Sequence, residues 1–264
     1  MSSPLVHAAA RDGILRLTLS DPKTRNSLSS EMMGALAQAL AAAATDQSVR
    51  VIVIAAIGPA FSSGHNLKEI TDHRSDGDGG KAFFAGIMNQ CAALMMAIVN
   101  HEKPVIAEVS GLASAAGCQL VASCDLAVAS EDASFCTPGV NIGLFCSTPM
   151  VALSRNVARK QAVEMLLTGD VIPASEAWRI GLINRVVPSN RLAEETDKLA
   201  RKIASKSLAV LKLGKQAFYR QAEMPLADAY ALTAGVMVEN LLLQDAQEGI
   251  SAFIGKRERR WQDR

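Results

Sequence analysis

The feature that most constrains the fold is the alternation of apolar strand patterns with helical patterns along most of the chain. The run VRVIVIAAI (49–57) is rich in β-branched residues, and PVIAEVS (104–110) is a second apolar run. Such continuous runs are typical of strands that are covered on both faces. Because strands and helices alternate up to about residue 190, we expect an α/β domain with layered sheets.

Other segments of this region fit the same class. We expect strands at 14–20 and 125–130, and helices from Ser29 or Ser30 to about Ala44 and over 81–100. The segment TDHRSDGDGG (71–80) is too polar and glycine-rich to pack, so we expect a surface loop there.

After Pro188 the pattern is almost wholly helical. We expect helices at about 189–206, 208–222, 225–243 and 245–255, the first of them capped by Ser189. A few helices cannot bury their apolar faces alone, so this tail should pack on the main domain or on another subunit. We therefore divide the chain into a core region, 1–190, and a C-terminal helical region, 191–264.

Composition excludes several classes of partner. The 27 basic and 26 acidic residues leave a formal charge of +1, so nothing global indicates nucleic acid or an anionic membrane. The longest strongly apolar runs, 51–57 and 93–99, are too short to span a bilayer. The first residues do not resemble a secretory signal, so we expect the cytoplasm, or the mitochondrial matrix in a eukaryote.

The thiols and imidazoles do not suggest a metal site. The five cysteines are odd in number and show neither a CxxC motif nor paired spacing, and the four histidines are scattered. We therefore expect reduced, mostly buried cysteines and no metal.

Two glycine-containing turns follow core strands, AFSSGHNLKEI (60–70) and GLASAAGCQL (111–120). If they lie side by side, the amides of His65 and Ala116 can converge on one carbonyl oxygen, and the Ala116 amide would sit at a helix N-terminus. From spacing alone, the pattern favours two tight strand-to-helix connections without a shared ligand.

Longer segments carry a resemblance. FSSGHNLKE (61–69) is similar to the FxxGxDLKE segment of the crotonase superfamily, which is the enoyl-CoA hydratase/isomerase family. The stretch 111–149 resembles the central signature of that family, and 167–188 and 248–257 resemble later segments in the same order. Together these segments extend the resemblance from about residue 14 to 257.

The resemblance implies a crotonase-like spiral of ββα turns, with C-terminal helices that build homotrimers or dimers of trimers. It implies an acyl-CoA thioester as the ligand, with coenzyme A as part of the substrate and no permanently bound cofactor. Matched by position, His65 and Ala116 provide the two backbone donors to the thioester carbonyl. Residues implied to bind CoA are Asn66, Leu67 and Lys68, together with Phe253 and Lys256, the last two often acting from a neighbouring subunit.

Two departures concern the reaction. Hydratases of the family carry one glutamate just after the GC of the helix start, where this chain has Gln119, and a second after a proline, where it has Gly139. An amide cannot carry a proton at neutral pH, and glycine has no side chain. Because each acid–base group typically contributes about 10²–10⁴-fold, we expect weak or absent hydration.

Several functions therefore stay open: an enoyl-CoA hydratase/isomerase-like enzyme, a non-catalytic acyl-CoA binder or regulator, a decarboxylase-like enzyme, and an RNA-binding relative. The decarboxylase tyrosine would fall near Cys146, and a dehalogenase aspartate near Ser147. Glu69 and Glu108 are the nearest carboxylates in sequence, without an assigned role. RNA binding is suggested by relatives and by basic residues of the tail, but interleaved aromatics are lacking. These residues are Lys198, Arg201, Lys202, Lys206, Lys212 and Lys215.

Overall fold

The computed structural model describes residues 4–264, so Met1 to Ser3 of the expected core region lie outside the described part. Its larger sheet has six strands in the order β1-β2-β3-β5-β7-β10, antiparallel only between β1 and β2. The bounds are β1 Val6–Arg11, β2 Ile14–Leu19, β3 Val51–Ala56, β5 Val105–Val109, β7 Leu126–Ser130 and β10 Arg185–Val187. The α/β prediction is confirmed.

A second sheet, in the order β4-β6-β8-β9, carries the turns of interest. Its strands are β4 Ala60–Ser62, β6 Leu112–Ser114, β8 Ser134–Cys136 and β9 Ile172–Pro173. Three successive pairs, β3 with β4, β5 with β6 and β7 with β8, each place one strand in each sheet before a helix follows. The repeated unit is therefore a ββα turn, and stacking these turns builds the two sheets.

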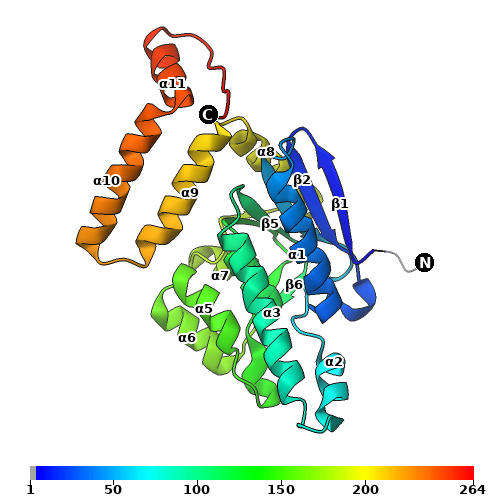
Figure 1. The fold of residues 1–264 in the computed structure, drawn as a ribbon. Coiled ribbons are helices and arrows are strands. Elements are labelled where there is room, and N and C mark those ends of the chain that lie inside the picture. Colours follow the sequence, from blue (N-terminus) through cyan, green and yellow to red (C-terminus); the bar gives the residue numbers. More distant parts are fainter. Residues whose placement is uncertain (1–3) are drawn as a thin grey trace.

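Helices cover the larger sheet on both faces (Figure 1). On one face, α1 (Ser30–Thr45), α3 (Lys81–Val99) and α4 (Ala116–Ser123) enclose the main core. On the other face, α8 (Leu192–Ala204) packs on Val51, Val53 and Ile106 through Leu192 and Leu199. This accounts for the continuous apolar run of β3, which is buried on both sides.

The remaining helices complete the described chain. They are α2 Leu67–Asp72, α5 Ser147–Asn156, α6 Arg159–Thr168, α7 Ala174–Arg179, α9 Leu208–Ala222, α10 Leu226–Leu242 and α11 Gln244–Ile254, with short 3-10 turns η1 Pro22–Thr24, η2 His73–Ser75, η3 Pro138–Ile142 and η4 Ser189–Arg191. We call α9, α10 and α11 the C-terminal arm. It projects from the body (Figure 1), and α10 packs mainly on α9 and α11.

Three expectations need correction. The segment 71–80 is not a plain loop, because α2 and η2 occupy its first half and His73 stacks on Phe83 at 3.7 Å between ring centroids. Ser189 does not cap a helix, since its hydroxyl donates to Asp132 and α8 begins only at Leu192.

The third correction concerns the length of the longest apolar segment. The helix α3 has 19 residues and a window of mean hydropathy 1.8, so by length and composition it is long and apolar enough to cross a membrane. Alanines and phenylalanines extend the helix beyond the short apolar run at 93–99. In the fold, Ile87, Cys91 and Leu94 of α3 are buried in the core against α1 and α4.

Candidate active site

The two glycine-containing turns meet at the ends of neighbouring strands. The strands β4 and β6 pair in parallel, so the residues that follow them leave the sheet at the same edge. A Cβ placed on Gly64 would lie 3.0 Å from the Ala115 Cβ and 3.3 Å from the Ala116 nitrogen. Gly64 also has a φ of +89°, a conformation that favours glycine. The structure therefore brings the two turns into direct contact.

The second turn is strained. Ala115 has φ 48° and ψ −115°, outside the conformations that a residue with a Cβ normally adopts. It connects β6 to α4 in a single residue, and α4 begins at Ala116. Gly117 packs so closely on β4 that a Cβ there would lie 2.4 Å from the Ser62 carbonyl oxygen. Strain of this kind persists only where the surroundings impose it, and it is common at functional sites.

The amides of His65 and Ala116 are left without acceptors. Among residues 4–264, no hydrogen bond outside regular helices and strands is donated by either amide, and Ala116, as the first residue of α4, has no intrahelical acceptor. The helix dipole adds partial positive charge at Ala116. Two free amides on contacting turns can stabilise an oxygen that gains negative charge.

The His65 ring is neutral in this environment. Its Nδ1 lies 3.3 Å from the Leu28 carbonyl oxygen, and its Nε2 is buried without a hydrogen-bond partner in the described chain. Burial lowers the pKa of His65, and the contact with Leu28 only partly opposes this effect. At neutral pH, the ring therefore adds no positive charge beside the free amides.

The residues after His65 form the start of α2 and a surface hollow. The Asn66 side chain caps α2, accepting hydrogen bonds from the amides of Lys68 at 3.1 Å and Glu69 at 3.3 Å. Leu67 and Lys68 are exposed. Asn66 and Lys68 line a hollow of about 360 Å³ together with residues of α1 and η2. The hollow therefore begins directly after the first turn, and its lining includes no residue of the second turn.

Gln119 lies one turn into α4 and is buried, with a residue exposure of 5%. Its Oε1 accepts a weak contact from the Cys91 thiol at 3.8 Å. Burial raises the pKa of Cys91 to about 11, so the thiol stays protonated at neutral pH. At the position expected for the first acid, the Gln119 amide and the neighbouring Cys91 thiol thus both stay uncharged at neutral pH.

The position of the second acid is closed. Gly139 is buried in η3, and a Cβ there would lie 2.9 Å from the Leu144 carbonyl oxygen and 3.0 Å from the Cys146 sulfur. The Leu144 amide donates to the Gly139 carbonyl at 2.9 Å, which ties the loop back on itself. Gly139 therefore lacks both an acid and the space for one in this loop conformation.

The other candidate groups are engaged elsewhere or inert. Burial raises the pKa of Cys146. Glu69 accepts a hydrogen bond from the Ser30 amide at 3.2 Å. Glu108 of β5 forms an ion pair with Arg16 of β2 at 2.5 Å. Ser147 donates to the Phe145 carbonyl at 3.3 Å. Within residues 4–264, no group of three or more His, Cys, Asp or Glu side chains is placed to hold a metal ion.

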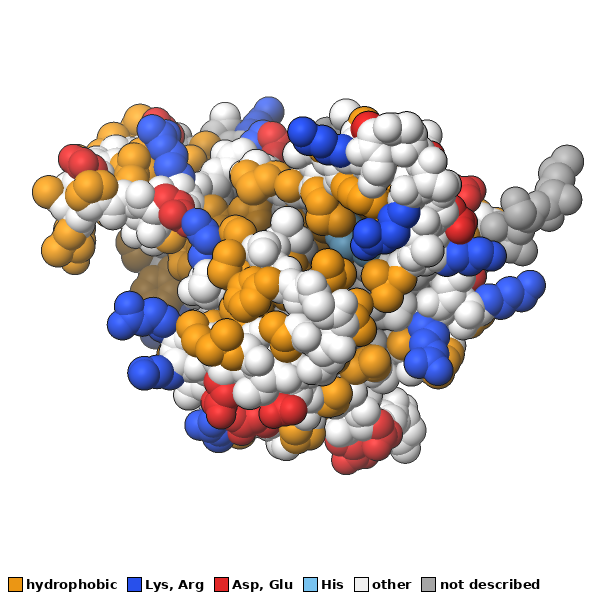
Figure 2. All heavy atoms as spheres, turned by 90° about the horizontal axis from the view of Figure 1, so that it is seen from below, with side chains coloured by type: hydrophobic (Ala, Val, Ile, Leu, Met, Phe, Trp, Pro, Cys, Tyr) orange, Lys and Arg blue, Asp and Glu red, His pale blue; other side chains and the backbone are white. Residues whose placement is uncertain are grey.

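Phe253 and Lys256 lie far from these turns within one chain. They sit at the end of α11, on the opposite side of the molecule from α2 (Figure 1), and Phe253 is 75% exposed. The structure therefore does not bring them to His65 in a single copy. The face seen from the side of α5 and α6 shows hydrophobic side chains gathered around a hollow (Figure 2). Both helices carry exposed apolar residues, among them Val151 and Leu167.

Ala115 is a residue of the site that the sequence alone does not reveal. Its strained backbone directs the chain into α4 at the point where the free amide lies. Alanine gives no local signal for a positive φ, so only its place between a short strand and a helix start indicates a tight connection.

The chain is similar to known proteins over most of its length. The family model described as enoyl-CoA hydratase/isomerase matches residues 9–264. A human protein, "Enoyl-CoA hydratase domain-containing protein 3, mitochondrial", is 54% identical over 250 residues, which is 95% of this chain and 81% of that protein.

Two solved structures are similar over nearly the whole chain. The crystal structure of human enoyl coenzyme A hydratase domain-containing protein 3 has a TM-score of 0.92 and 52% identity, covering 97% of this chain and 100% of that one. An enoyl-CoA hydratase from Mycobacterium smegmatis has a TM-score of 0.94 and 45% identity, with coverages of 98% and 99%. The spiral of ββα turns expected from the sequence is confirmed.

Proposed function

Since the chain belongs to the enoyl-CoA hydratase/isomerase family, we propose that it binds an acyl-CoA thioester and hydrates enoyl-CoA weakly or not at all. The amides of His65 and Ala116 donate to the thioester carbonyl oxygen. Coenzyme A enters as part of the substrate, and no other cofactor is bound permanently.

The observation that carries this proposal is the contact between the two turns. Gly64 and Ala115 touch, and the amide that follows each of them has no acceptor within the described chain. A thioester carbonyl is polarised toward an oxyanion when two preorganised donors face it, and this stabilisation is often the largest single contribution to acyl chemistry. The same donors hold a ground-state thioester in a protein that only binds.

The CoA moiety runs from these turns over Asn66, Leu67 and Lys68. Phe253 and Lys256 reach its nucleotide end from a second copy, because they are too far away within one chain. The apolar arm supports such an assembly: Leu242 is 72% and Tyr230 71% exposed, although both are large and apolar. We propose a homotrimer or a dimer of trimers.

A non-catalytic acyl-CoA binder is the second candidate. Gln119 cannot transfer a proton, and the loop at Leu144–Cys146 fills the space that a side chain at 139 needs. A decarboxylase-like reaction is less well supported, because Cys146 replaces the tyrosine and burial raises its pKa.

RNA binding is disfavoured by the tail itself. Four of the six basic residues named in the sequence analysis already form ion pairs, and Lys215 is among the most buried of them. The pairs are Lys198–Glu194, Arg201–Asp197, Lys212–Glu102 and Lys215–Asp125. Such pairs reduce the positive charge that these four residues offer to phosphates. Of the two compartments considered, the name of the human relative favours the mitochondrial matrix over the cytoplasm.

The test combines binding and turnover. We expect calorimetry to show binding of butyryl-CoA, and the absorbance of crotonyl-CoA to fall very slowly or not at all. Ala116→Pro removes one donor at a helix position that tolerates proline, so it should weaken binding at least tenfold while the circular dichroism stays unchanged.

The outcomes separate the candidates. Binding without turnover supports the binder, and slow turnover that Ala116→Pro abolishes supports the weak hydratase. Rapid hydration by the unmodified protein would contradict the missing acids. Failure to bind any acyl-CoA would remove both candidates.

A further inference from the structure

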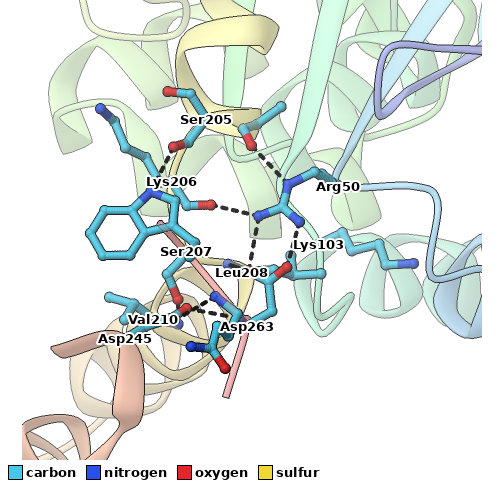
Figure 3. Close-up of polar contacts among 12 residues, drawn as sticks. Arg50, Lys103, Ser205, Lys206, Ser207, Leu208, Val210, Asp245 and Asp263 are labelled. Atoms are coloured by element: carbon cyan, nitrogen blue, oxygen red, sulfur yellow. Dashed lines mark hydrogen bonds and ion pairs between the residues drawn. The ribbon is translucent and has the colours of Figure 1, made fainter. Parts of the chain in front are cut away.

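The C-terminal segment, residues 257–264, returns from α11 to the body and ends in a dense set of polar contacts (Figure 3). At its centre lies Arg50, just before β3. Its guanidinium donates to both carboxylate oxygens of Asp263, at 2.5 and 2.9 Å, to the Ala204 carbonyl at 2.8 Å and to the Lys206 carbonyl at 2.7 Å. One side chain of the body therefore holds both the last residues of the chain and the link between α8 and α9.

Asp263 also binds the start of α9. Its Oδ1 accepts from the amide of Leu208, the first residue of α9, at 2.6 Å. A carboxylate at a helix N-terminus is favoured by the helix dipole. The hydrogen bond from Arg50 lowers the pKa of Asp263, so its carboxylate is charged throughout the neutral range. The base of the arm and the end of the chain are thus joined at one carboxylate.

A second carboxylate extends the contact to α11. Asp245, in the first turn of α11, is 1% exposed and accepts from the amides of Gln262 at 2.7 Å and Asp263 at 2.9 Å. Its own amide donates to the Arg264 carbonyl at 3.1 Å. The Trp261 indole donates to the Ser205 carbonyl at 2.9 Å. We call Arg50, Asp245, Trp261 and Asp263, with these contacts, the Arg50 clamp.

The clamp ties the first turn of α11, through Asp245, and the returning segment to the body. The helices α10 and α11 are bent by 71° relative to each other at Leu243, and α10 packs mainly within the arm. Lys256 lies one residue after the Gly255 cap of α11, has a φ of +50° and connects the helix to the returning segment. It is therefore held from two sides, by α11 and by a segment that is anchored to the body.

We propose that the Arg50 clamp fixes the angle of α11 and thereby positions the arm's nucleotide-binding end for the CoA of a second copy. This rests on the function proposed above. Arg50 and Asp263 are positioning residues, since they act through α11 and touch no substrate.

The test uses two ligands that differ only at the nucleotide end. In Arg50→Gln, we expect butyryl-CoA to bind about tenfold more weakly, whereas butyryl-pantetheine, which lacks the nucleotide, binds as it does to the unmodified protein. A merely structural defect would weaken both ligands alike. Asp263→Asn should show the same pattern to a smaller degree, and it serves if Arg50→Gln does not fold.

Arg179→Gln is the matched control. It breaks another bidentate arginine–carboxylate pair, with Glu176, away from the arm, and it should change neither affinity. Unchanged butyryl-CoA affinity in a folded Arg50→Gln protein, or equal losses for both ligands, would overturn the positioning role alone. If the unmodified protein binds neither ligand, the proposed function fails and this inference fails with it.

Discussion

At the scale of single residues, the site combines a preserved pair of donors with two altered positions. The donors are backbone amides, so they depend on the geometry of Gly64 and Ala115 rather than on a reactive side chain. The two altered positions differ from each other. Position 119 holds a buried glutamine side chain, whereas the space beside Gly139 is filled by the Leu144 carbonyl and the Cys146 sulfur. A glutamate should therefore fit at position 119 but not at position 139.

Gln119→Glu should introduce slow hydration. The substitution keeps the size of the side chain and adds a group that can carry a proton, beside the Cys91 thiol. One acid–base group typically contributes about 10²–10⁴-fold, and we expect the lower end because the second acid is absent. The measurement is the loss of enoyl-thioester absorbance with crotonyl-CoA. Gln119→Met is the control, and equal rates for the two variants would contradict a role for this position.

Gly139→Ala should destabilise the fold by about 1–3 kcal/mol, because the added Cβ meets Leu144 and Cys146 in a packed loop. Gly139→Glu should cost more, so a combined Gln119→Glu and Gly139→Glu variant is a poor test of restored catalysis. Chemical denaturation measures the free energy of unfolding of both Gly139 variants.

Gly86→Ala is the control for this prediction. It lies in the exposed part of α3, where an added Cβ meets nothing within 4 Å, and it should stabilise by about 0.5–1 kcal/mol. If Gly139→Ala were equally harmless, the loop would have to move freely to admit a side chain.

At the scale of elements, a helix or strand is predictable from the sequence where local interactions decide it. It is not predictable where contacts with residues distant in the sequence decide it. Strand β3 and helix α1 were predictable because β-branched runs and a Ser29 cap act locally, and Ser29 does accept from the Met32 amide at 3.1 Å. The three-residue strands β4 and β6 read as parts of turns in the sequence, since β4 is a strand through its pairing with β6, and β6 through its pairing with β4 and β8.

The same distinction holds for the candidate site. The family motif placed both turns correctly in the chain, and the structure brings them into contact. The strain at Ala115 and the closure of the loop over Gly139 were not predictable, because both depend on neighbours distant in sequence or on backbone angles that alanine does not signal. The division at residue 190 remains a prediction.

The junction of α1 and α3 should make stability fall as the pH drops below about 6.5. His101, after α3, is buried, with Nε2 at 3.1 Å from the Leu40 carbonyl of α1, while Nδ1 accepts from the Lys103 amide. Burial lowers the pKa of His101 below its ordinary value of 6.5. The unfolded chain therefore binds more protons, so this stability is present above about pH 6.5 and is lost as the pH falls toward the folded pKa.

The check is the free energy of unfolding measured by denaturant at several pH values. His65 acts in the same direction, since burial lowers its pKa too. His101→Gln should be less stable at pH 7 but should show a smaller loss between pH 7 and 5. An unchanged slope would mean that His101 is not responsible.

At the scale of the whole molecule, the two parts of the proposed ligand site lie at opposite ends of one chain. The free amides lie near α2, and the residues proposed to bind the nucleotide lie at the end of α11 (Figure 1). The exposed apolar residues of the arm favour an assembly that brings one end to the other in a neighbouring copy. In a closed ring every copy would then give one half-site and receive another.

Mixing two defective chains tests this arrangement. Ala116→Pro removes an amide from the thioester half, and Lys256→Ala removes the cation from the nucleotide half, so neither homogeneous assembly should bind butyryl-CoA with full affinity. In a trimer mixed equally at random, roughly a quarter of the sites pair an intact amide with an intact lysine from the next copy. Calorimetry on the co-refolded mixture should therefore regain about that fraction of full-affinity sites. If both halves of a site belonged to one chain, mixing would restore none, because every chain would keep its own defect.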